Sequence, residues 1–384
     1  MMSLLIRKRQ LAAKIESVEG VAEALSVANA GILVNFTPKA NYDPQMYQRD
    51  PVRSSLTKMG KLTGKRSAGL DFSIELKGSG SLIEDPEWAD LIKACGFEVN
   101  DLSKITIGAI TSGPFEHGET ITGDTSGAQG RVVIKTENGT TTLYFVEISG
   151  TFENSETIEG DTSGANASSA SVPLDAGKEV KPISSAAPSL TMGLYEDGVR
   201  KLLKGCRGSL KFNFKIGEPA MIDLSFKGVE SGVTDTPLFT GVSFDETVPP
   251  VLLNAVMSCD EVSLNIGELE IDIANTLAAK DKIDDAKGIL SFMITGRDTQ
   301  GSFNPEMVSV ATHDFFDKWF SNTPMVLDLA YGETDGNKFR IYAPGIIYNK
   351  VDDGDRDGIQ LAQTSFDVTG SMEPGDDEIT LLLL

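Results

Sequence analysis

The sequence has few of the residues that build disulfide frameworks, histidine-dependent active sites or membrane spans. Its 384 residues include 3 cysteines and 2 histidines. Three cysteines do not make a network of paired disulfides, and Cys95 falls on the apolar stripe of a predicted helix. We therefore expect reduced thiols and folding in a reducing compartment. No apolar run approaches the roughly 18 residues of a transmembrane helix, so we expect no membrane association, and no signal-peptide pattern directs export.

Positive charge is also scarce. The chain has 34 lysines and arginines against 56 aspartates and glutamates, a formal net charge of −22. This balance disfavours a general nucleic-acid binder, which needs cations to neutralise phosphates. The carboxylates have two interpretations: an ordinary solvated surface, or a negative wall that repels DNA inside a conduit. The sequence alone leaves both open.

Patterns for catalysis and metal binding are sparse as well. His117 and His313 have no nucleophile motif beside them, since no Gly-x-Ser-x-Gly occurs, and we expect them in surface or capping positions. Asp353, Asp355 and Asp357 match the first half of a calcium loop, but a threonine stands at the twelfth position, where a bidentate glutamate belongs. An acidic hairpin turn is the favoured interpretation and calcium binding the weaker one. We expect no enzymatic activity and no cofactor.

What the sequence does contain is a strand–helix plan that occurs twice. In residues 70–97, apolar and polar residues alternate as in a half-buried strand, glycines break the pattern, and Asp85-Pro86 and Gly96 predict the start and end of a helix. Residues 288–322 repeat this order, with a glycine break at Gly296 and Gly301 and an apolar helix face around Phe315–Phe320. Strands with glycine-marked turns follow both stretches. The repetition indicates one unit used twice.

A shorter repeat lies between these stretches, in a segment rich in threonine, serine and glycine. Residues 113–128 return as residues 150–165, with Glu119 and Glu156 in equivalent positions, and Asn138-Gly139 between them predicts a hairpin turn. We interpret residues 99–173 as an inserted β module of two similar halves.

These patterns predict a mainly β chain with four parts. Residues 1–20 form an N-terminal arm, residues 21–98 and 174–235 a discontinuous first unit, residues 99–173 the insert, and residues 236–384 the second unit. Residues 37–66 are predicted as a long polar loop after a short strand at 31–36. The apolar end, Leu381–Leu384, is predicted as an exposed strand that needs a partner edge.

Outside the insert, the sequence resembles the tail tube (major tail) proteins of phages with long, non-contractile tails. The resemblance is carried by a series of motifs in order: Arg9–Glu16 with Gly20, Tyr47–Asp50, Leu76–Gly80, Pro86–Phe97, Asp197-Gly198, Gly205–Gly208, Gly217–Pro219, Gly336-Asn337, Asp355–Gly358 and Gly375–Ile379. It implies two tandem tail-tube-like antiparallel β-sandwich or barrel units, each with a flanking helix, plus the small inserted β domain.

The resemblance also implies a function. Tail tube proteins assemble as rings that stack around a tape-measure protein and later pass DNA, and the inner sheets of neighbouring subunits join into one barrel. Long loops and terminal arms hold ring to ring, which implies assembly roles for residues 1–20, 37–66 (with Tyr47, Arg49 and Asp50) and the leucine-rich tail. The insert departs from the family and is expected to face outward.

The expected protein is thus a structural, self-assembling subunit of a virion tail, made in the host bacterial cytoplasm. Its expected partners are copies of itself, the tape-measure protein and the tail terminator and tip proteins, while DNA transits without specific binding. If each chain supplies two units, three chains complete a pseudo-sixfold ring, so a trimer is favoured over a hexamer. The alternative is a tail-tip or surface adhesin that binds host glycan through residues 99–173.

Overall fold

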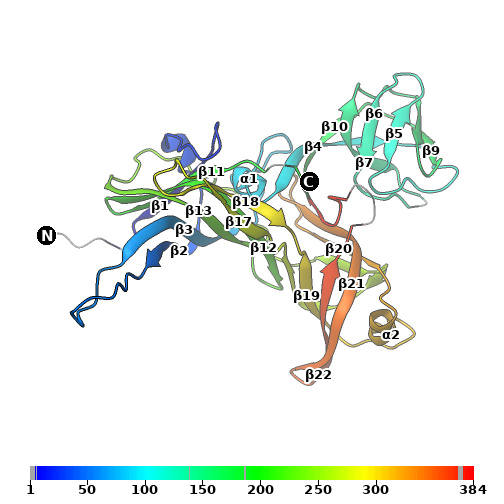
Figure 1. The fold of residues 1–384 in the computed structure, drawn as a ribbon. Helices are drawn as coiled ribbons and strands as arrows, with labels where there is room; N and C mark the ends of the chain where they lie inside the picture. The colour runs from blue at the N-terminus through cyan, green and yellow to red at the C-terminus, as the bar shows by residue number, and fades with distance from the viewer. Residues whose placement is uncertain (1–4, 6, 138, 186, 371–374) are drawn as a thin grey trace.

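The structure is a computed structural model that describes residues 5, 7–137, 139–185, 187–370 and 375–384. It is mainly β, as predicted, with two short helices (Figure 1). The strands before the insert are β1 (Arg9–Ile15), β2 (Asn35–Tyr47), β3 (Leu62–Glu75) and β4 (Phe97–Thr106). The insert contains β5 (Thr120–Gly123), β6 (Gln129–Val132), β7 (Thr142–Ser149), β8 (Thr157–Gly160) and β9 (Asn166–Ser168).

The remaining elements complete two similar series. After the insert come β10 (Leu174–Pro182), β11 (Leu190–Glu196), β12 (Val199–Lys215) and β13 (Met221–Asp235). The C-terminal part contains β14 (Val256–Cys259), β15 (Val262–Ser263), β16 (Ile266–Asp272), β17 (Thr276–Asp281), β18 (Ile289–Gly296), β19 (Gln300–Pro305), β20 (Met325–Tyr331), β21 (Phe339–Arg356), β22 (Ile359–Val368) and β23 (Thr380–Leu383). The helices are α1 (Ala89–Lys93) and α2 (Phe315–Phe320), with a 3-10 turn at Val27–Asn29.

Two sets of six strands share one pairing order. The first set runs β2–β3–β13–β12–β11–β1 and the second runs β16–β19–β22–β21–β20–β14, with antiparallel neighbours throughout. Each set also has its helix in the same place along the chain, since α1 follows β3 and α2 follows β19. The two sets therefore share their order of elements, and the duplication itself stays a prediction.

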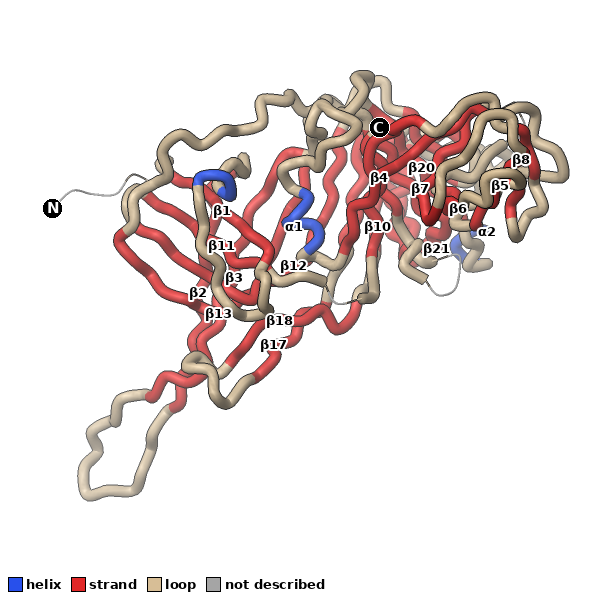
Figure 2. Tube along the Cα trace, turned by 90° about the horizontal axis from the view of Figure 1, so that it is seen from above, coloured by secondary structure: helices blue, strands red, loops and turns tan. Residues whose placement is uncertain are grey.

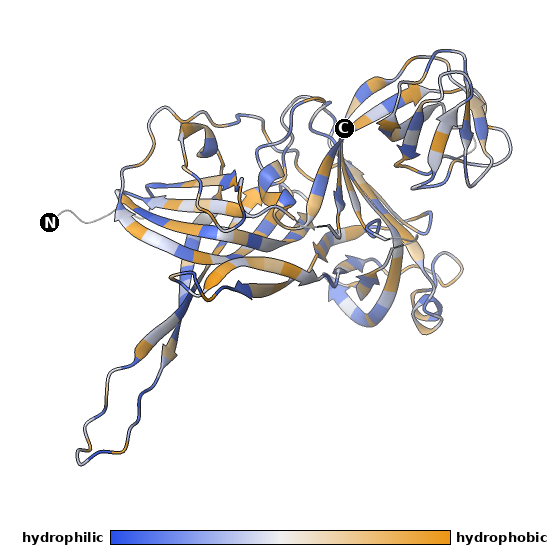
Figure 3. Ribbon diagram, turned by 45° about the horizontal axis from the view of Figure 1, so that its top comes forward, coloured by the Kyte–Doolittle hydropathy of each residue, from blue (hydrophilic) through white to orange (hydrophobic). Residues whose placement is uncertain are grey.

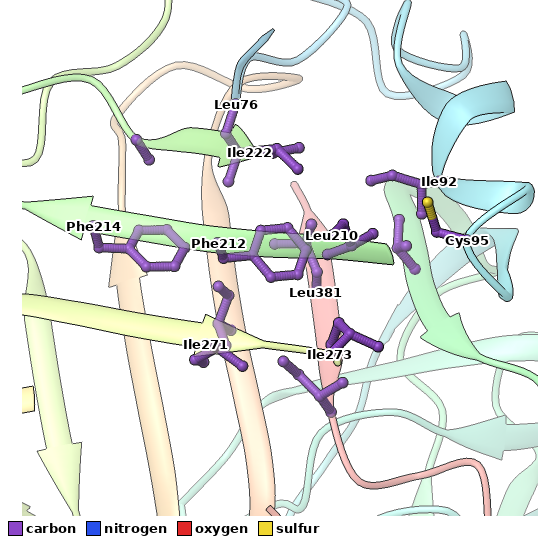
Figure 4. Close-up of a cluster of buried hydrophobic side chains, with 14 of the residues drawn as sticks. Leu76, Ile92, Cys95, Leu210, Phe212, Phe214, Ile222, Ile271, Ile273 and Leu381 are labelled. Atoms are coloured by element: carbon purple, nitrogen blue, oxygen red, sulfur yellow. The ribbon is translucent and has the colours of Figure 1, made fainter. Parts of the chain in front are cut away.

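In the first set the long strand β12 takes part in two layers of sheet, one with β11 and one with β16. Residues 199–206 of β12 pair with β11, whereas residues 211–215 pair with β16. Apolar side chains from both layers meet in one core, together with Trp88, Leu91 and Ile92 of the α1 region. Figure 4 shows Phe212 and Phe214 of β12 in this core, with Ile271 of the neighbouring β16. Alternation in β12 and β13 thus gives one apolar and one polar face, as expected for a half-buried sheet.

Helix α1 confirms the predicted stripe but not the predicted start. Cys95 is a buried free thiol among apolar side chains. The helix ends at Lys93 with Ala94 as its C-cap, and Gly96 closes the following turn with a φ of 85°, in the region that glycine adopts at low cost. The N-cap residue is Trp88, so the prediction that Asp85 caps the helix is wrong. Asp85 instead receives Lys178 Nζ at 3.0 Å and Lys93 Nζ at 3.1 Å. Gly301, predicted as part of a break, lies inside β19.

Three predictions about extended segments are also wrong. The described part of the N-terminal arm is no free arm, because β1 pairs with β11 along its whole length. The short strand predicted at residues 31–36 begins at Asn35, and much of the polar stretch 37–66 is the β2–β3 hairpin rather than a loop. Pro38 and Pro44 hid this strand, but proline is tolerated on a sheet edge.

The apolar C-terminal end is buried in its own chain. Strand β23 pairs with β10 on one side and β21 on the other, which ties the first unit to the second. Leu381 and Leu383 face the main core, while Leu382 faces a separate cluster under the insert with Leu102 and Val133. The prediction of an exposed strand awaiting a partner copy is therefore wrong.

The insert follows from the antiparallel pair of strands β4 and β10 and has a small core of its own (Figures 1 and 3). Each half supplies a buried glutamate to the turn of the other half. Glu156 accepts from the backbone N–H of Ser126 at 3.0 Å, and Glu119 accepts from the backbone N–H of Ser163 at 3.0 Å. The reciprocal contacts explain why both positions of the repeat carry glutamate. Asn138 of the predicted hairpin turn lies outside the described residues.

Candidate assembly surface

One continuous sheet of eight strands crosses both sets. Its spatial order is β2–β3–β13–β12–β16–β19–β22–β21, and every neighbouring pair is antiparallel. On one face Phe72, Leu224 and Phe303 are buried in the core, and on the other face polar residues alternate with them. The sheet is therefore a wall with one wet side that spans the whole chain.

The wet side carries more carboxylates than ammonium groups. Its charged side chains include Asp43, Asp71, Glu75, Asp223, Glu268, Glu270, Asp272, Asp352 and Asp367, against Lys39, Lys211, Lys215, Lys227, Lys350 and Arg356. Hydrogen bonds run across the strands: Ser225 Oγ donates to Asp71 at 2.8 Å, and Asn213 Nδ2 donates to Asp223 at 2.8 Å. Cross-strand pairs of this kind hold side chains flat against the sheet.

The two sets meet at a single strand joint within this wall. Residues 211–215 of β12 pair with residues 268–272 of β16, which places Phe212 opposite Ile271 and Phe214 opposite Leu269. On the wet side Lys211 Nζ lies 2.6 Å from Glu270. Basic side chains on β12 thus face acidic side chains on β16, over an apolar seam.

The wall is open at both ends. Among the described residues, β2 pairs only with β3, and residues 350–356 of β21 pair only with β22. An unpaired strand edge presents backbone N–H and C=O groups that seek a further strand. By strand order, the outer edge of β2 corresponds to the joint edge of β16, and the end of β21 corresponds to the joint edge of β12.

The end of the β2–β3 hairpin, residues 43–66, forms a finger that projects away from the body (Figures 2 and 3). The side chains of Val52 and Leu56 are fully exposed at its tip, and those of Met46 and Tyr47 are half exposed. The finger has more cations than acids: Arg49, Arg53, Lys58, Lys61, Lys65 and Arg66 against Asp43 and Asp50. A basic, apolar segment on a chain of charge −22 is a candidate contact for an acidic partner surface.

The predicted site residues lie at these two ends of the wall. Tyr47 ends β2, and Arg49 and Asp50 follow it in the finger. Asp353 and Asp355 lie in β21 and Asp357 in the adjoining turn, so they form the acidic hairpin end that the sequence favoured. In the part of the chain that the structure describes, no group of three His, Cys, Asp or Glu side chains is arranged to hold a metal ion.

Both histidines are buried, which corrects the expectation of surface or capping roles. His313 Nε2 lies 3.1 Å from Tyr348 Oη, and the His117 ring packs 5.1 Å from Tyr342 at the junction of insert and second unit. Burial lowers the pKa of both imidazoles and raises the pKa of the Tyr348 hydroxyl. These are packing residues that join elements.

A comparison with models of protein families identifies the family of this chain. The family model described as phage tail tube protein matches residues 6–370. The chain belongs to this family. None of the curated proteins matches it. The match makes the chain a structural component of the phage tail, and the insert lies within the matched span.

For a tail tube protein, the residues that sequence reasoning missed are those of the open edges. Strand β2 was hidden by its prolines, and the exposed end of β21 was recognised only as an acidic turn. The described helices of this tail tube protein include none long and apolar enough to cross a bilayer. The alternation of β3, β12 and β13 was the one sequence signal that pointed to the wall.

Proposed function

We propose that copies of this tail tube protein join edge to edge into a closed ring, with the wet side of the eight-stranded wall lining the channel. The observation that carries the proposal is the internal joint between β12 and β16. By analogy with this joint, β21 of one copy would pair antiparallel with β2 of the next copy. Repeated around an axis, such a head-to-tail contact generates a ring if the rotation closes.

The chemistry of the free edges supports this pairing. Pro38 and Pro44 cannot donate a backbone hydrogen bond, so pairing is confined to residues 39–43 between them. This stretch has the same length as residues 268–272, which form the internal joint. The β2 stretch carries one cation, Lys39, and one carboxylate, Asp43. At the β21 edge the carboxylates of Asp352, Asp353 and Asp355 outnumber the cations Lys350 and Arg356, so Lys39 meets a net negative edge.

The size of the barrel favours three copies over six. Three walls of eight strands contain 24 strands, and strands about 4.8 Å apart and tilted by about 40° then give a barrel roughly 50 Å across. Six copies would double this to roughly 100 Å, a channel far wider than a single DNA duplex requires. Because the wet side carries an excess of carboxylates, it repels phosphates, so DNA passes without specific binding.

The insert is proposed to face outward. Leu382 contacts the cluster beneath the insert while its neighbours Leu381 and Leu383 face the main core, so the insert packs on the side of this layer away from the core. The channel face lies beyond that core. We further propose that the rings stack around a tape-measure protein between the terminator and tip proteins, and that the subunit is made in the host bacterial cytoplasm, where the free thiols stay reduced.

Electron microscopy of the purified protein tests the proposal. We expect hollow rings and stacked tubes at high protein concentration, with three copies per ring in averaged end views. Six copies per ring would overturn the trimeric closure. Monomers at every concentration would overturn the assembly itself, and specific retention on a glycan array by such monomers would favour the adhesin alternative.

A further inference from the structure

Lys77 is a buried lysine that the proposed ring does not use. It follows the end of β3 by two residues, and its side chain is only 1% exposed. A lysine is almost never buried to this degree unless carboxylates pair with it. Two carboxylates approach its Nζ, Asp245 Oδ2 at 3.5 Å and Glu87 Oε1 at 3.6 Å. Glu87 precedes α1, and Asp245 lies in the segment 236–255 that joins β13 to β14.

Hydrogen bonds to the backbone hold these three residues together. Lys77 Nζ donates to the carbonyl oxygen of Asp245 at 2.7 Å, which fixes the amine against the joining segment. The indole N–H of Trp88 donates to the carbonyl oxygen of Lys77 at 2.8 Å. Because Glu87 is the residue before Trp88, this bond also keeps Glu87 beside Lys77. The amine and the two carboxyl groups are therefore held at fixed relative positions.

The carboxyl group of Asp245 is oriented by the chain around it. Its Oδ1 accepts from the backbone N–H of Thr247 at 2.9 Å, while its Oδ2 is the oxygen near Lys77. The carbonyl oxygen of Val248 accepts from Asn337 Nδ2 at 2.8 Å, which ties the joining segment to the second unit. A backbone N–H on one carboxyl oxygen can hold the negative charge that develops there when a nucleophile attacks the carbon.

Glu87 is more than an ion pair at Lys77 requires. One carboxylate balances one ammonium ion, yet Glu87 is a second carboxyl group, and its Oε2 is buried with no hydrogen-bond partner among the described residues. Burial raises the pKa of Glu87, and the charge of Asp245 adds to this effect against the opposing charge of Lys77. A carboxyl group that tends to keep its proton, placed beside an amine and a second carboxyl group, can relay protons between them.

We propose that Lys77 and Asp245 become joined by an isopeptide bond between Nζ and Cγ, which the chain forms on itself with Glu87 as the proton relay. The side chain that stands ready to be attacked is the one that Thr247 orients. Holding an amine against a carboxyl group can raise its effective concentration to the order of 10⁵ M or more, which favours condensation within the protein. The three residues belong to one chain, so the inference does not depend on the proposed ring.

The reaction consists of proton transfers and the loss of one water. Burial alone would raise the pKa of Asp245, but hydrogen bonds from Thr247 and the charge of Lys77 lower it, so the carboxylate must gain a proton first. A proton passes from the Lys77 ammonium group to Asp245, and the Nζ lone pair attacks Cγ. Glu87 then takes a proton from the nitrogen and gives one to Oδ2, which leaves as water. One C–N bond forms, one C–O bond breaks, and nothing is oxidised or reduced.

The bond closes a covalent loop from residue 77 to residue 245. This loop contains α1, the insert and strands β4 to β13, and the bond fastens the joining segment to the end of β3. A cross-link of this kind restricts the unfolded chain and so stabilises the fold, as a disulfide does. Unlike a disulfide, an amide persists in a reducing compartment.

Intact-mass spectrometry of the full-length protein tests the bond. We expect the mass of most molecules to be lower than that of the sequence by one water. After trypsin digestion we expect a branched peptide that joins the residues around 77 to those around 245, because trypsin does not cleave after an acylated lysine. Water can also be lost where aspartate precedes glycine, as at Asp353 and Asp357, so the branched peptide is the deciding observation.

Substitutions separate this chemistry from a simple ion pair. Glu87→Gln keeps the size of the side chain but not its relay of protons, and we expect the linking rate to fall on the order of a hundredfold or more. Lys77→Arg keeps the positive charge without a nucleophilic amine and should abolish the link. Asp245→Asn offers a carboxamide to the amine, so its linked product should lack one ammonia instead of one water.

Lys178→Arg is the matched control. Lys178 is also a buried lysine between two carboxylates, but its partners Asp85 and Asp101 are 44% and 85% exposed, and we expect this variant to keep the link between residues 77 and 245. An undiminished mass of the wild-type protein, both when freshly purified and after prolonged incubation, would show an ion pair only and would overturn the proposal. Loss of water without the branched peptide would also overturn it, and unchanged linking in Glu87→Gln would remove the role of Glu87. The wild-type measurement needs no variant, so misfolding of a variant cannot imitate either result.

Discussion

The stability that the contact between the β17–β18 hairpin and the first unit contributes can be measured by changing Glu19. Its carboxylate receives Arg207 Nη1 at 2.8 Å, Lys280 Nζ at 2.9 Å and Ser291 Oγ at 2.8 Å. Lys280 and Ser291 lie in the hairpin, and Arg207 lies in β12. Burial alone would raise the pKa of Glu19, but the hydrogen bonds from Lys280, Arg207 and Ser291 outweigh it and lower the pKa from 4.5 to about 2.

The shift in the pKa of Glu19 gives the size of its contribution to the free energy of unfolding and the direction in which that contribution changes with pH. A difference of about 2.5 between the folded and unfolded pKa corresponds to about 3.4 kcal/mol, and solvent screening of the partly exposed carboxylate reduces this to about 1–2 kcal/mol. Because the folded pKa is depressed, the contribution is complete above pH 4.5 and is lost as the pH falls toward 2. Glu19→Gln removes the charge and should abolish this pH dependence.

Urea denaturation of both proteins at a series of pH values is the assay. At pH 7 we expect Glu19→Gln to lower the free energy of unfolding by about 1–2 kcal/mol, with the difference shrinking between pH 4.5 and 2. Glu218→Gln is the control, since Glu218 pairs with Lys215 on the surface and exposed pairs contribute little. Equal stability of Glu19→Gln and wild type at pH 7, or a difference that persists unchanged at pH 2, would refute the reasoning.

Two further substitutions test the packing around the insert. Leu382→Ala empties a fully buried site between β23 and the insert and should cost about 2–5 kcal/mol of unfolding free energy, whereas Leu62→Ala on the exposed finger should change it by less than about 0.5 kcal/mol. Similar urea midpoints for both would contradict the assigned burial. Glu119→Ala leaves the turn at Ser163 without its buried acceptor and should cost about 1–3 kcal/mol. Hydrogen exchange should then accelerate at the amides around Ser163, and unchanged protection there would contradict the reciprocal capping.

Local patterns predicted the elements whose sequence carries their own period. Strict alternation marked β12 and β13, and the spacing of Trp88, Leu91 and Ile92 with a final Gly96 marked the first helix. The structure confirms these because each of them buries a face that the pattern itself defines. The predicted mainly β class follows from the same signals.

Elements set by distant partners were not visible in the sequence. Strand β23 owes its burial to β10 and β21, which lie far from it in the chain, so its leucines looked like an exposed end. Residues 9–15 show no strict alternation of apolar and polar side chains, so the sequence hid β1, which is defined by its pairing with β11. The candidate site was missed for a related reason, since an open edge is defined by the absence of a neighbour, and no local pattern encodes that.

The shared pairing order of the two sets of strands raises a question of assembly to which the charges of the chain are relevant. In the proposed ring, the joint inside the chain and the joint between copies could be confused during assembly, because β2 and β16 hold equivalent places in their sets of strands. At the inner joint the cations Lys211 and Lys215 lie on β12 and the carboxylates lie on β16. At the proposed outer joint carboxylates such as Asp352 lie on β21, while β2 carries Lys39 together with Asp43 and continues into the basic finger. The acidic edge of β16 is therefore repelled by the acidic end of β21, and like charges placed opposite each other disfavour a wrong partner. In the proposed ring, this repulsion would disfavour a contact between β21 of one copy and β16 of another.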